Sequence, residues 1–332
     1  MATGTGVKSD FVIYHDEFFS GVNEVVQQNS NVFNAASSNA IRLVPRMLQG
    51  DYDKQSFFKA IETIVSRRDP TSVADADIQK LEQGELQGVK LNRKIGPVYN
   101  TIDSFKKIQV DPREFSFVLG QQTGEEALRD YVNTGALSVS TAIQALDPSM
   151  VVTATGTADE KKLNAGHLIA TMAKMGDRAQ RIRAWVMHSK PWFDLMAGQV
   201  SDKVTNISDV VIYGGSPGTL GRPVIVTDSP YLVNYQTVTS GPDGDNYIVL
   251  GLTEDAVVMN QSEEESIMSD ILLGKENLIM QYQGEYAYNI RVKGFAFASS
   301  LNPTAATLGT TGNWTFQMHD QKLGPGAAVV VE

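Results

Sequence analysis

The sequence predicts an α+β fold, with helices in the middle of the chain and strands in its second half. Residues 123–146 carry a stripe of apolar side chains at helical spacing, and a second such stripe follows residue 157. After residue 200, short runs rich in valine, isoleucine and tyrosine alternate with turn signals such as SPG and PDGD. Helices followed by a run of strands are typical of α+β domains.

The composition is that of a globular protein with an acidic balance. The chain has 332 residues, 42% hydrophobic and 20% charged, with a net charge of −10 and no cysteine. No apolar run approaches the roughly 20 residues of a membrane helix, and no signal peptide is recognisable, so we expect a cytosolic protein. The lack of cysteine excludes disulfides, thiolate zinc sites and cysteine nucleophiles. The acidic balance argues against sequence-specific binding of nucleic acid.

The first part of the chain alternates between polar segments and short structured ones. Residues 1–40 are rich in Asn, Gln and Ser, and the apolar phase at Phe18 and Val22 is too short for a core. We therefore expect a disordered tail or an arm that is ordered by other subunits. Residues 41–48 read as a strand, and the apolar stripe between Asp53 and Arg67 predicts a helix.

A long excursion follows this predicted helix. Residues 68–88 are acidic and rich in turn formers, and the basic, strand-like stretch 89–110 is interrupted at Gly96–Pro97. Such excursions inside a compact domain are usually functional or interaction loops.

Capping boxes mark two predicted helix starts. Thr123 with Glu126, and Thr157 with Glu160, fit the S/T-x-x-E pattern that satisfies free amides at a helix start. We expect Asp147–Pro148 to end the first helix. The second helix leads to a strand, AWVMH, and to a short helix from Ser189 to Gly198. The strands expected after residue 200 are VVIYGG, PVIVTDS, NYIVLGLTEDAVVMN, IMQYQGEYAYNIRVKGFAFA and AAVVVE.

No motif predicts a reactive centre. Residues 214–218 match G-x-S-x-G around Ser216, but a serine hydrolase needs a helix after the serine, and a strand is expected here. The four histidines lack metal-ligand spacing, and His188 is expected to bond a turn. Residues 243–246 read as a solvated turn and Glu263–Glu265 as an exposed turn or helix start. We therefore expect no enzyme activity, no catalytic residue, no metal and no cofactor.

Several short motifs, in a fixed order, resemble the Hong Kong 97-type major capsid proteins of tailed bacteriophages. The resemblance covers residues 110–305. The motifs that carry it are Trp185–Ser189 followed by Pro191–Leu195, Gly221–Asp228, Tyr247–Gly251 with Asp255–Val258, and Tyr288–Phe295 with Asn302–Pro303.

The resemblance implies a Hong Kong 97-like capsid fold with four parts. They are an N-terminal arm at 1–40, an extended loop region at 41–110, a peripheral domain with a long helix at 111–158 and 251–332, and an axial domain at 159–250. By this analogy Gly96–Pro97 marks the tip or a bend of the loop. We expect the contacts between subunits to involve Arg93, Lys94, Gly96, Pro97, Lys106 and Lys107, facing acidic neighbours such as Asp75, Asp77 or Glu263–Glu265.

The resemblance implies a structural function. We expect a major capsid protein that assembles in the host cytoplasm into pentamers and hexamers of an icosahedral head, found in the virion. The head would enclose double-stranded DNA without reading its sequence and without a membrane. Expected partners are a portal, a separate scaffolding protein and a decoration protein. The alternatives are the shell protein of a cellular nanocompartment, a tail-tube protein, and a serine hydrolase that uses Ser216.

Overall fold

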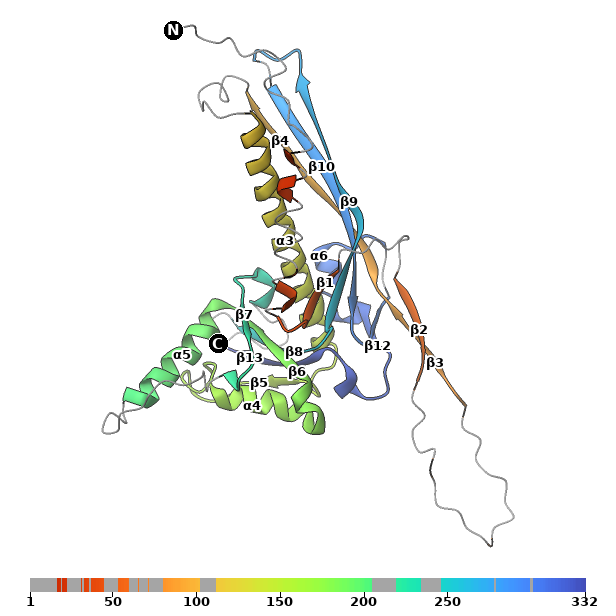
Figure 1. Cartoon of the computed structure of the whole chain (residues 1–332). Coiled ribbons are helices and arrows are strands. Elements are labelled where there is room, and N and C mark those ends of the chain that lie inside the picture. The colour runs from red at the N-terminus through yellow and green to blue at the C-terminus, as the bar shows by residue number, and fades with distance from the viewer. Residues whose placement is uncertain are drawn as a thin grey trace.

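The computed structural model is elongated, with long strands and a long helix rising from a wider base (Figure 1). It describes residues 17–18, 20–22, 31, 33–35, 37–44, 53–59, 65, 71, 80–101, 112–204, 219–233, 246–277, 279–298 and 301–332. A narrow two-stranded ribbon leaves the base in the opposite direction from the tall layer. Within the described residues the strands form three sheets.

The tall layer is the spine sheet, with strand order β1-β9-β10-β4. Its strands are β1 Ile41–Val44, β4 Val89–Thr101, β9 Val257–Leu272 and β10 Ile279–Val292. The central strand, β10, runs antiparallel to both β9 and β4, whereas β1 runs parallel to β9. In its outer half β10 alternates between buried residues such as Met280 and exposed ones such as Gln283, so one face is covered and the other is open.

The other two sheets form the ribbon and the base. The ribbon sheet has the order β12-β11-β3-β2, with β2 Lys54–Phe58, β3 Gln83–Gln87, β11 Phe295–Phe297 and β12 Trp314–Phe316. The base sheet has the order β5-β13-β8-β6-β7. Its strands are β5 Val151–Thr153, β6 Ile182–Met187, β7 Val224–Val226, β8 Tyr247–Thr253 and β13 Gly326–Val331.

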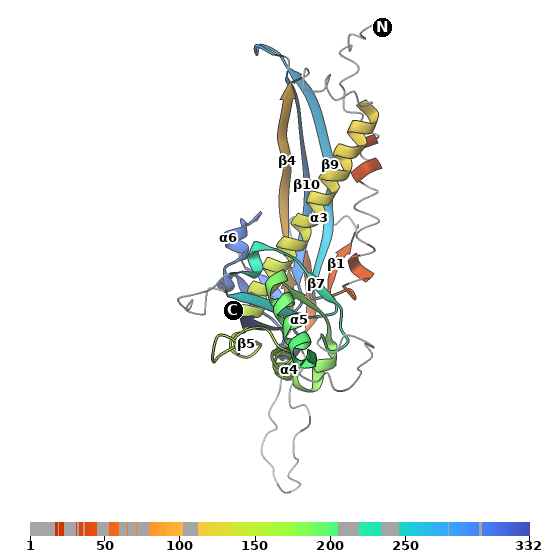
Figure 2. The same ribbon diagram turned by 90° about the vertical axis from the view of Figure 1, so that its left-hand side faces the viewer.

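One long helix connects the spine sheet to the base, and shorter helices surround the base. The α-helices are α3 Pro112–Gln144, α4 Ala165–Lys174, α5 Ser189–Val204 and α6 Ala305–Leu308. The 3-10 turns are η2 Gly176–Arg181, η4 Pro230–Leu232, η5 Thr311–Asn313 and η6 Gln321–Leu323. Seen from the side, α3 crosses the covered face of the spine sheet (Figure 2).

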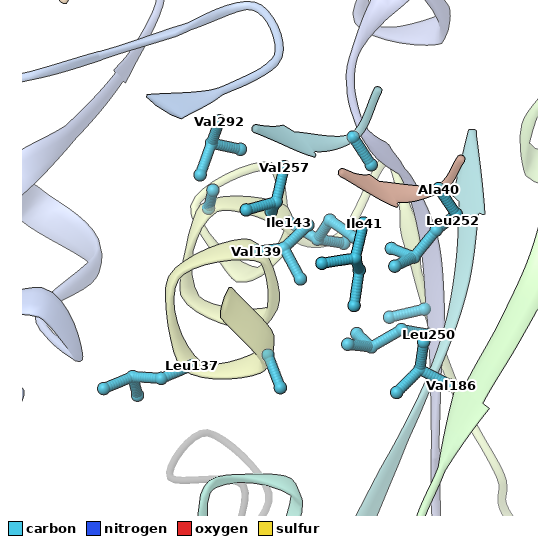
Figure 3. Close-up of a cluster of buried hydrophobic side chains, with 14 of the residues drawn as sticks. Ala40, Ile41, Leu137, Val139, Ile143, Val186, Leu250, Leu252, Val257 and Val292 are labelled. Atoms are coloured by element: carbon cyan, nitrogen blue, oxygen red, sulfur yellow. The ribbon is translucent and has the colours of Figure 1, made fainter. Parts of the chain in front are cut away.

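The core lies where α3 meets the spine and base sheets. Val139 and Ile143 of α3 face Ile41 of β1 and Val257 of β9, all four without exposed surface, as Figure 3 shows. Leu250 of β8 completes this contact from the base sheet. Burial of such aliphatic side chains contributes about 1.5–3 kcal/mol each. The core therefore fixes the angle at which the spine sheet leaves the base.

The strands that the sequence predicts are confirmed wherever they fall on described residues. The predicted runs correspond to β1, β6, β7, β8 with β9, β10 with β11, and β13. The run VVIYGG lies outside the described residues. The predicted helix from Asp53 to Arg67 is wrong for Lys54–Phe58, which form β2. Pairing of β2 with β3 there overrides the helical spacing of the apolar residues.

Both helix starts predicted from capping boxes are wrong. The long helix begins at Pro112, and the Thr123 hydroxyl donates to the carbonyl of Leu119 inside it. Glu160 does accept hydrogen bonds from Thr157, but only in a turn, and α4 begins after Asn164, whose side chain caps it. The third helix, α5, starts at Ser189 as expected but runs past Gly198 to Val204.

Part of the polar N-terminal segment packs against α3 of the same chain. Phe18 and Val22 are buried with Ile267 of β9 and Met280 of β10. The segment approaches α3 very closely, because a Cβ at Gly120 would lie 2.3 Å from the carbonyl oxygen of Phe18. These described residues therefore have packing partners within their own chain.

A polar cluster links the middle of α3 to the spine sheet. Oδ2 of Asp130 on α3 accepts hydrogen bonds from Nε of Arg93 at 2.9 Å, from the hydroxyl of Tyr288 at 2.9 Å and from that of Tyr286 at 3.1 Å. Arg93 also donates to the hydroxyl of Thr134 at 3.1 Å. We call these five residues the Asp130 cluster. It joins β4, β10 and α3 at one point.

The environment of the cluster keeps its two tyrosines protonated and Arg93 charged. Burial and the Asp130 charge raise the pKa of both Tyr286 and Tyr288, so the two phenols remain hydrogen-bond donors. Burial alone would lower the pKa of Arg93, but the interactions of Arg93 with Tyr288 and Asp130 outweigh burial and raise the pKa. Tyr131 packs edge-on against Tyr288, with ring centroids 4.6 Å apart, and shields the cluster.

Substitution of Gly120 tests the contact of the N-terminal segment. We expect Gly120→Ala to displace the described residues 17–18 and 20–22, because the added Cβ collides with backbone. The lost burial should lower the free energy of unfolding by about 2–3 kcal/mol, although the higher helix propensity of alanine contributes about 1 kcal/mol in the opposite direction. Limited proteolysis and thermal unfolding measure this. The matched control is Gly135→Ala, whose Cβ would lie 2.8 Å from the terminal methyl group of Met259 and would otherwise make ordinary van der Waals contacts with Val257 and Ile41. Equal stability and equal proteolysis of the two variants would contradict the contact.

Substitution of Asp130 tests the polar cluster. We expect Asp130→Asn to lower the free energy of unfolding by about 2–3 kcal/mol, because the half-buried Arg93 loses its counterion. The control, Glu126→Gln, removes an exposed carboxylate from the same helix and should cost less than about 0.5 kcal/mol. Chemical denaturation measures both. Equal values for the two variants would show that the cluster does not hold α3 on the sheet.

Candidate assembly surfaces

Of the residues predicted to make subunit contacts, the four that the structure describes lie on β4, at the edge of the spine sheet. Arg93 belongs to the Asp130 cluster and therefore has partners in its own chain. Lys94 is exposed and is paired in register with Glu285 of β10. Lys106 and Lys107 lie outside the described residues. Of the two described cations in the predicted set, Lys94 is therefore the exposed one, whereas Arg93 is held within its own subunit.

Gly96 and Pro97 lie within β4 and not at the tip of the ribbon. Gly96 has a φ of +76°, and a Cβ there would lie 2.8 Å from the amide nitrogen of Val98. The register between β4 and β10 shifts at this point, between Tyr282 and Gly284. Pro97 is exposed on the edge strand, where its missing N–H removes one site for pairing with a foreign strand. The pair lies at an irregularity in the pairing of β4 with β10.

The acidic residues predicted to face these cations are only partly described. Asp75 and Asp77 lie outside the described residues. Glu263 forms an ion pair with Lys90 across the open face of the spine sheet of the same chain. The run Glu263–Glu265 was expected in a turn or helix start, but it lies in β9, where pairing with β10 determines its conformation.

The ribbon of β2 and β3 exposes apolar side chains beyond the last contact with the body. Phe58, at the end of β2, is 63% exposed, and Leu81, just before β3, is 49% exposed. At the other end, Arg291 holds the ribbon through an ion pair with Asp53 at 3.3 Å and a hydrogen bond to Gln55 at 3.0 Å. A two-stranded hairpin alone is at best marginally stable in water. The ribbon is therefore a surface that gains stability when covered.

A second apolar surface lies on α5, which projects from the base (Figure 1). Leu195 is buried against the core, whereas Phe193 is 67% exposed and Met196 is 40% exposed on the outer side. His188 precedes the helix, and its Nδ1 accepts a hydrogen bond from the amide of Lys190 at 3.3 Å, as expected for a turn. Exposed aromatic and methionine side chains on one helical face are typical of protein contacts.

The described residues contain no recognisable metal site or catalytic site. They contain no group of His, Asp and Glu side chains that could hold a metal ion, and none of their helices is long and apolar enough to cross a membrane. Ser216 lies outside them, but the first described residues after it, from Thr219 on, form a turn and then β7, not the helix that a nucleophile elbow requires. Burial lowers the pKa of His167, which lies in the first turn of α4.

Sequence analysis missed the partners of Arg93 and the exposed face of α5. Asp130 is 37 residues away from Arg93, and no local pattern connects the two. The spacing of Tyr286 and Tyr288 did indicate that their hydroxyl groups lie on the same side of the strand, because alternate residues of a strand share one face. For Phe193 and Met196, the apolar spacing was visible, but exposure cannot be distinguished from burial in a single sequence.

Comparison with solved structures shows the fold. The capsid of Ralstonia phage GP4 aligns with a TM-score of 0.52 at 11% identity, over 88% of this chain and 87% of that one. The capsid of cyanophage Pam1 aligns with a TM-score of 0.51 at 11% identity, over 88% of each chain. The virus-like particle of Pyrococcus furiosus aligns over 97% of this chain with a TM-score of only 0.41. The fold is thus the Hong Kong 97-like capsid fold that the sequence predicts.

Comparison with protein families identifies the chain. Among curated proteins, no sequence matches it. The Gp13-like family, described as major capsid protein 13-like, matches residues 10–328, which is nearly the whole chain. An elongated subunit with two exposed apolar surfaces and no described reactive centre agrees with that match. The chain therefore belongs to the major capsid protein 13-like family, whose members build the shells of bacteriophage heads.

Proposed function

We propose that this capsid protein tiles a closed icosahedral head as hexamers and pentamers that enclose double-stranded DNA. The observation that carries the proposal is the pair of exposed apolar surfaces at opposite sides of the subunit, the ribbon and the outer face of α5. Two different surfaces on one subunit allow heterologous contacts, which close into rings when the rotation between copies permits. The α5 surface forms the rings, and the ribbon reaches a neighbouring copy.

The proposal keeps the four parts expected from the sequence: arm 1–40, extended loop region 41–110, peripheral domain 111–158 and 251–332, and axial domain 159–250. Within the loop region, the described strands favour a projecting part between residues 53 and 87, because β1 and β4 belong to the spine sheet. The proposal also includes assembly in the host cytoplasm, with a portal, a separate scaffolding protein and a decoration protein as partners.

The function is structural, and the proposal includes the absence of enzyme activity. The contents of purified particles distinguish a phage head from the shell of a cellular nanocompartment. Nuclease-protected DNA of uniform length supports the phage head, whereas protein cargo without DNA would contradict it.

Shortening the ribbon tests its role in assembly. Replacement of residues 61–80 by an Asn-Gly turn would close the hairpin just beyond the described strands β2 and β3. We expect folded, soluble subunits with an unchanged unfolding temperature that form no closed shells in negative-stain electron microscopy. Normal shells from this variant would refute a role of the ribbon in contacts between subunits.

A point substitution separates ribbon contacts from general loss of apolar surface. We expect Phe58→Ser to reduce the yield of shells by about tenfold, because an aromatic side chain at the centre of a contact often contributes 2 kcal/mol or more. The control is Ile169→Ser on α4, a side chain that is 55% exposed and lies away from the ribbon. Shell yield by sedimentation measures both variants, and equal yields would contradict the role of Phe58.

A further inference from the structure

Positive charge gathers around the turn before β9, although the whole chain has 28 Lys and Arg residues against 38 Asp and Glu residues. Two polar grooves, of about 530 and 550 Å³, meet at this turn, at Asp255 and Glu254. Together with Asp53, these are the three carboxylates among the residues that line the grooves. The cations that line them are twice as many: Arg42, Lys54, Arg183, Arg222, Arg291 and Lys293.

Two of these cations have only neutral partners. Arg222 donates from Nε to the carbonyl of Ile182 at 2.6 Å and from its terminal nitrogen to that of Ala179 at 3.3 Å. Lys293 donates to the backbone carbonyl of Glu254 at 2.6 Å and to a threonine hydroxyl. Within the described part of the chain, neither cation has a carboxylate within ion-pair distance. Neither charge is therefore neutralised by a direct ion pair.

The cations are also close enough to repel one another. Burial lowers the pKa of Arg222, and the nearby charge of Arg183 lowers it further. Burial likewise lowers the pKa of Lys293, where Arg181 adds to the effect and Asp255 and Glu254 oppose it. Arg183 approaches its nearest carboxylate, Glu254, only to 3.9 Å, and both side chains are more than half exposed. An anion bound between these cations would relieve the repulsion.

We propose that the surface formed by the groove cations Arg42, Arg183, Arg222 and Lys293, with Arg181 near Lys293, binds the phosphodiester backbone of the DNA inside the shell. The inference rests on the proposed function, which supplies DNA at high local concentration. Guanidinium groups favour phosphate, because their planar fork donates two parallel hydrogen bonds to it. A contact that is weak in each subunit suffices when it is repeated on every copy of the wall. The surface thereby offsets part of the repulsion between an acidic wall and DNA.

A double substitution tests this surface. Arg181→Gln with Arg183→Gln removes two exposed cations whose side chains do not support the backbone, as that of Arg222 does. The control, Arg129→Gln with Lys162→Gln, removes the same charge from exposed positions on α3 and before α4. Binding of a short fluorescent DNA duplex to unassembled subunits is measured over a range of salt concentrations. Both variants are also examined for shell formation.

We expect the Arg181/Arg183 variant to lose about tenfold in affinity for the duplex at low salt. The slope of log affinity against log salt concentration should become shallower by the amount that corresponds to about two phosphate contacts. The control should change less than about twofold, and both should form shells. Shells assembled with duplex should protect it from nuclease. The inference would be overturned if both variants lost the same affinity for the duplex, or if the wild type did not bind it. It would also be overturned if nuclease cleaved all of the duplex that the shells hold.

A polyglutamate competitor distinguishes DNA from an acidic protein segment. We expect polyglutamate to displace the duplex only at a higher concentration of charge than unlabelled DNA requires. Displacement at a lower concentration would assign the surface to an acidic protein instead and overturn the inference. A wild type that binds duplex but never forms shells would defeat the proposed function and leave duplex binding on this surface intact.

Discussion

The attachment of α3 to the spine sheet is the constraint on which the rest of the subunit depends. The spine sheet extends beyond the main core, and there α3 and the described residues 17–18 and 20–22 pack on its buried face. Aliphatic contacts hold the lower part of this interface, at Val139 and Ile143, and the Asp130 cluster holds the middle. Close packing at Gly120 holds the outer part. A loss at any of these points would allow the spine to move relative to the base.

A fixed spine gives the exposed surfaces a function. β10 runs the length of the spine and leads directly to β11, which carries the ribbon sheet, while the base presents α5. Because these elements share one core, the distance and angle between the ribbon and α5 are set by the fold of a single subunit. A shell needs this property, since small errors in angle add up over many copies.

The predictability of each element follows from the range of the interactions that determine it. Strands such as β8 and β13 were predictable, because apolar runs in a buried sheet are a local pattern. β2 was not, because pairing with β3, about thirty residues later, decides its conformation. The capping box at Thr123 misled for a related reason, since a threonine inside a helix can bond to the preceding turn. The family resemblance gave the fold, which no single one of these patterns determines.

The predicted contact residues show the same limit. Arg93 and Lys94 are neighbours with similar chemistry, yet Arg93 is held by Asp130 and Lys94 is exposed. Only the fold distinguishes them, because adjacent strand residues point to opposite faces. The apolar surfaces on the ribbon and α5 became recognisable only when exposure was known.

Electron cryomicroscopy of the wild-type protein after assembly tests the central claim most directly. The account requires closed particles with icosahedral symmetry, in which density for a neighbouring subunit covers Phe58 on the ribbon and Phe193 on α5. Monomers that persist at high concentration, or open tubes in which both side chains face solvent, would contradict it.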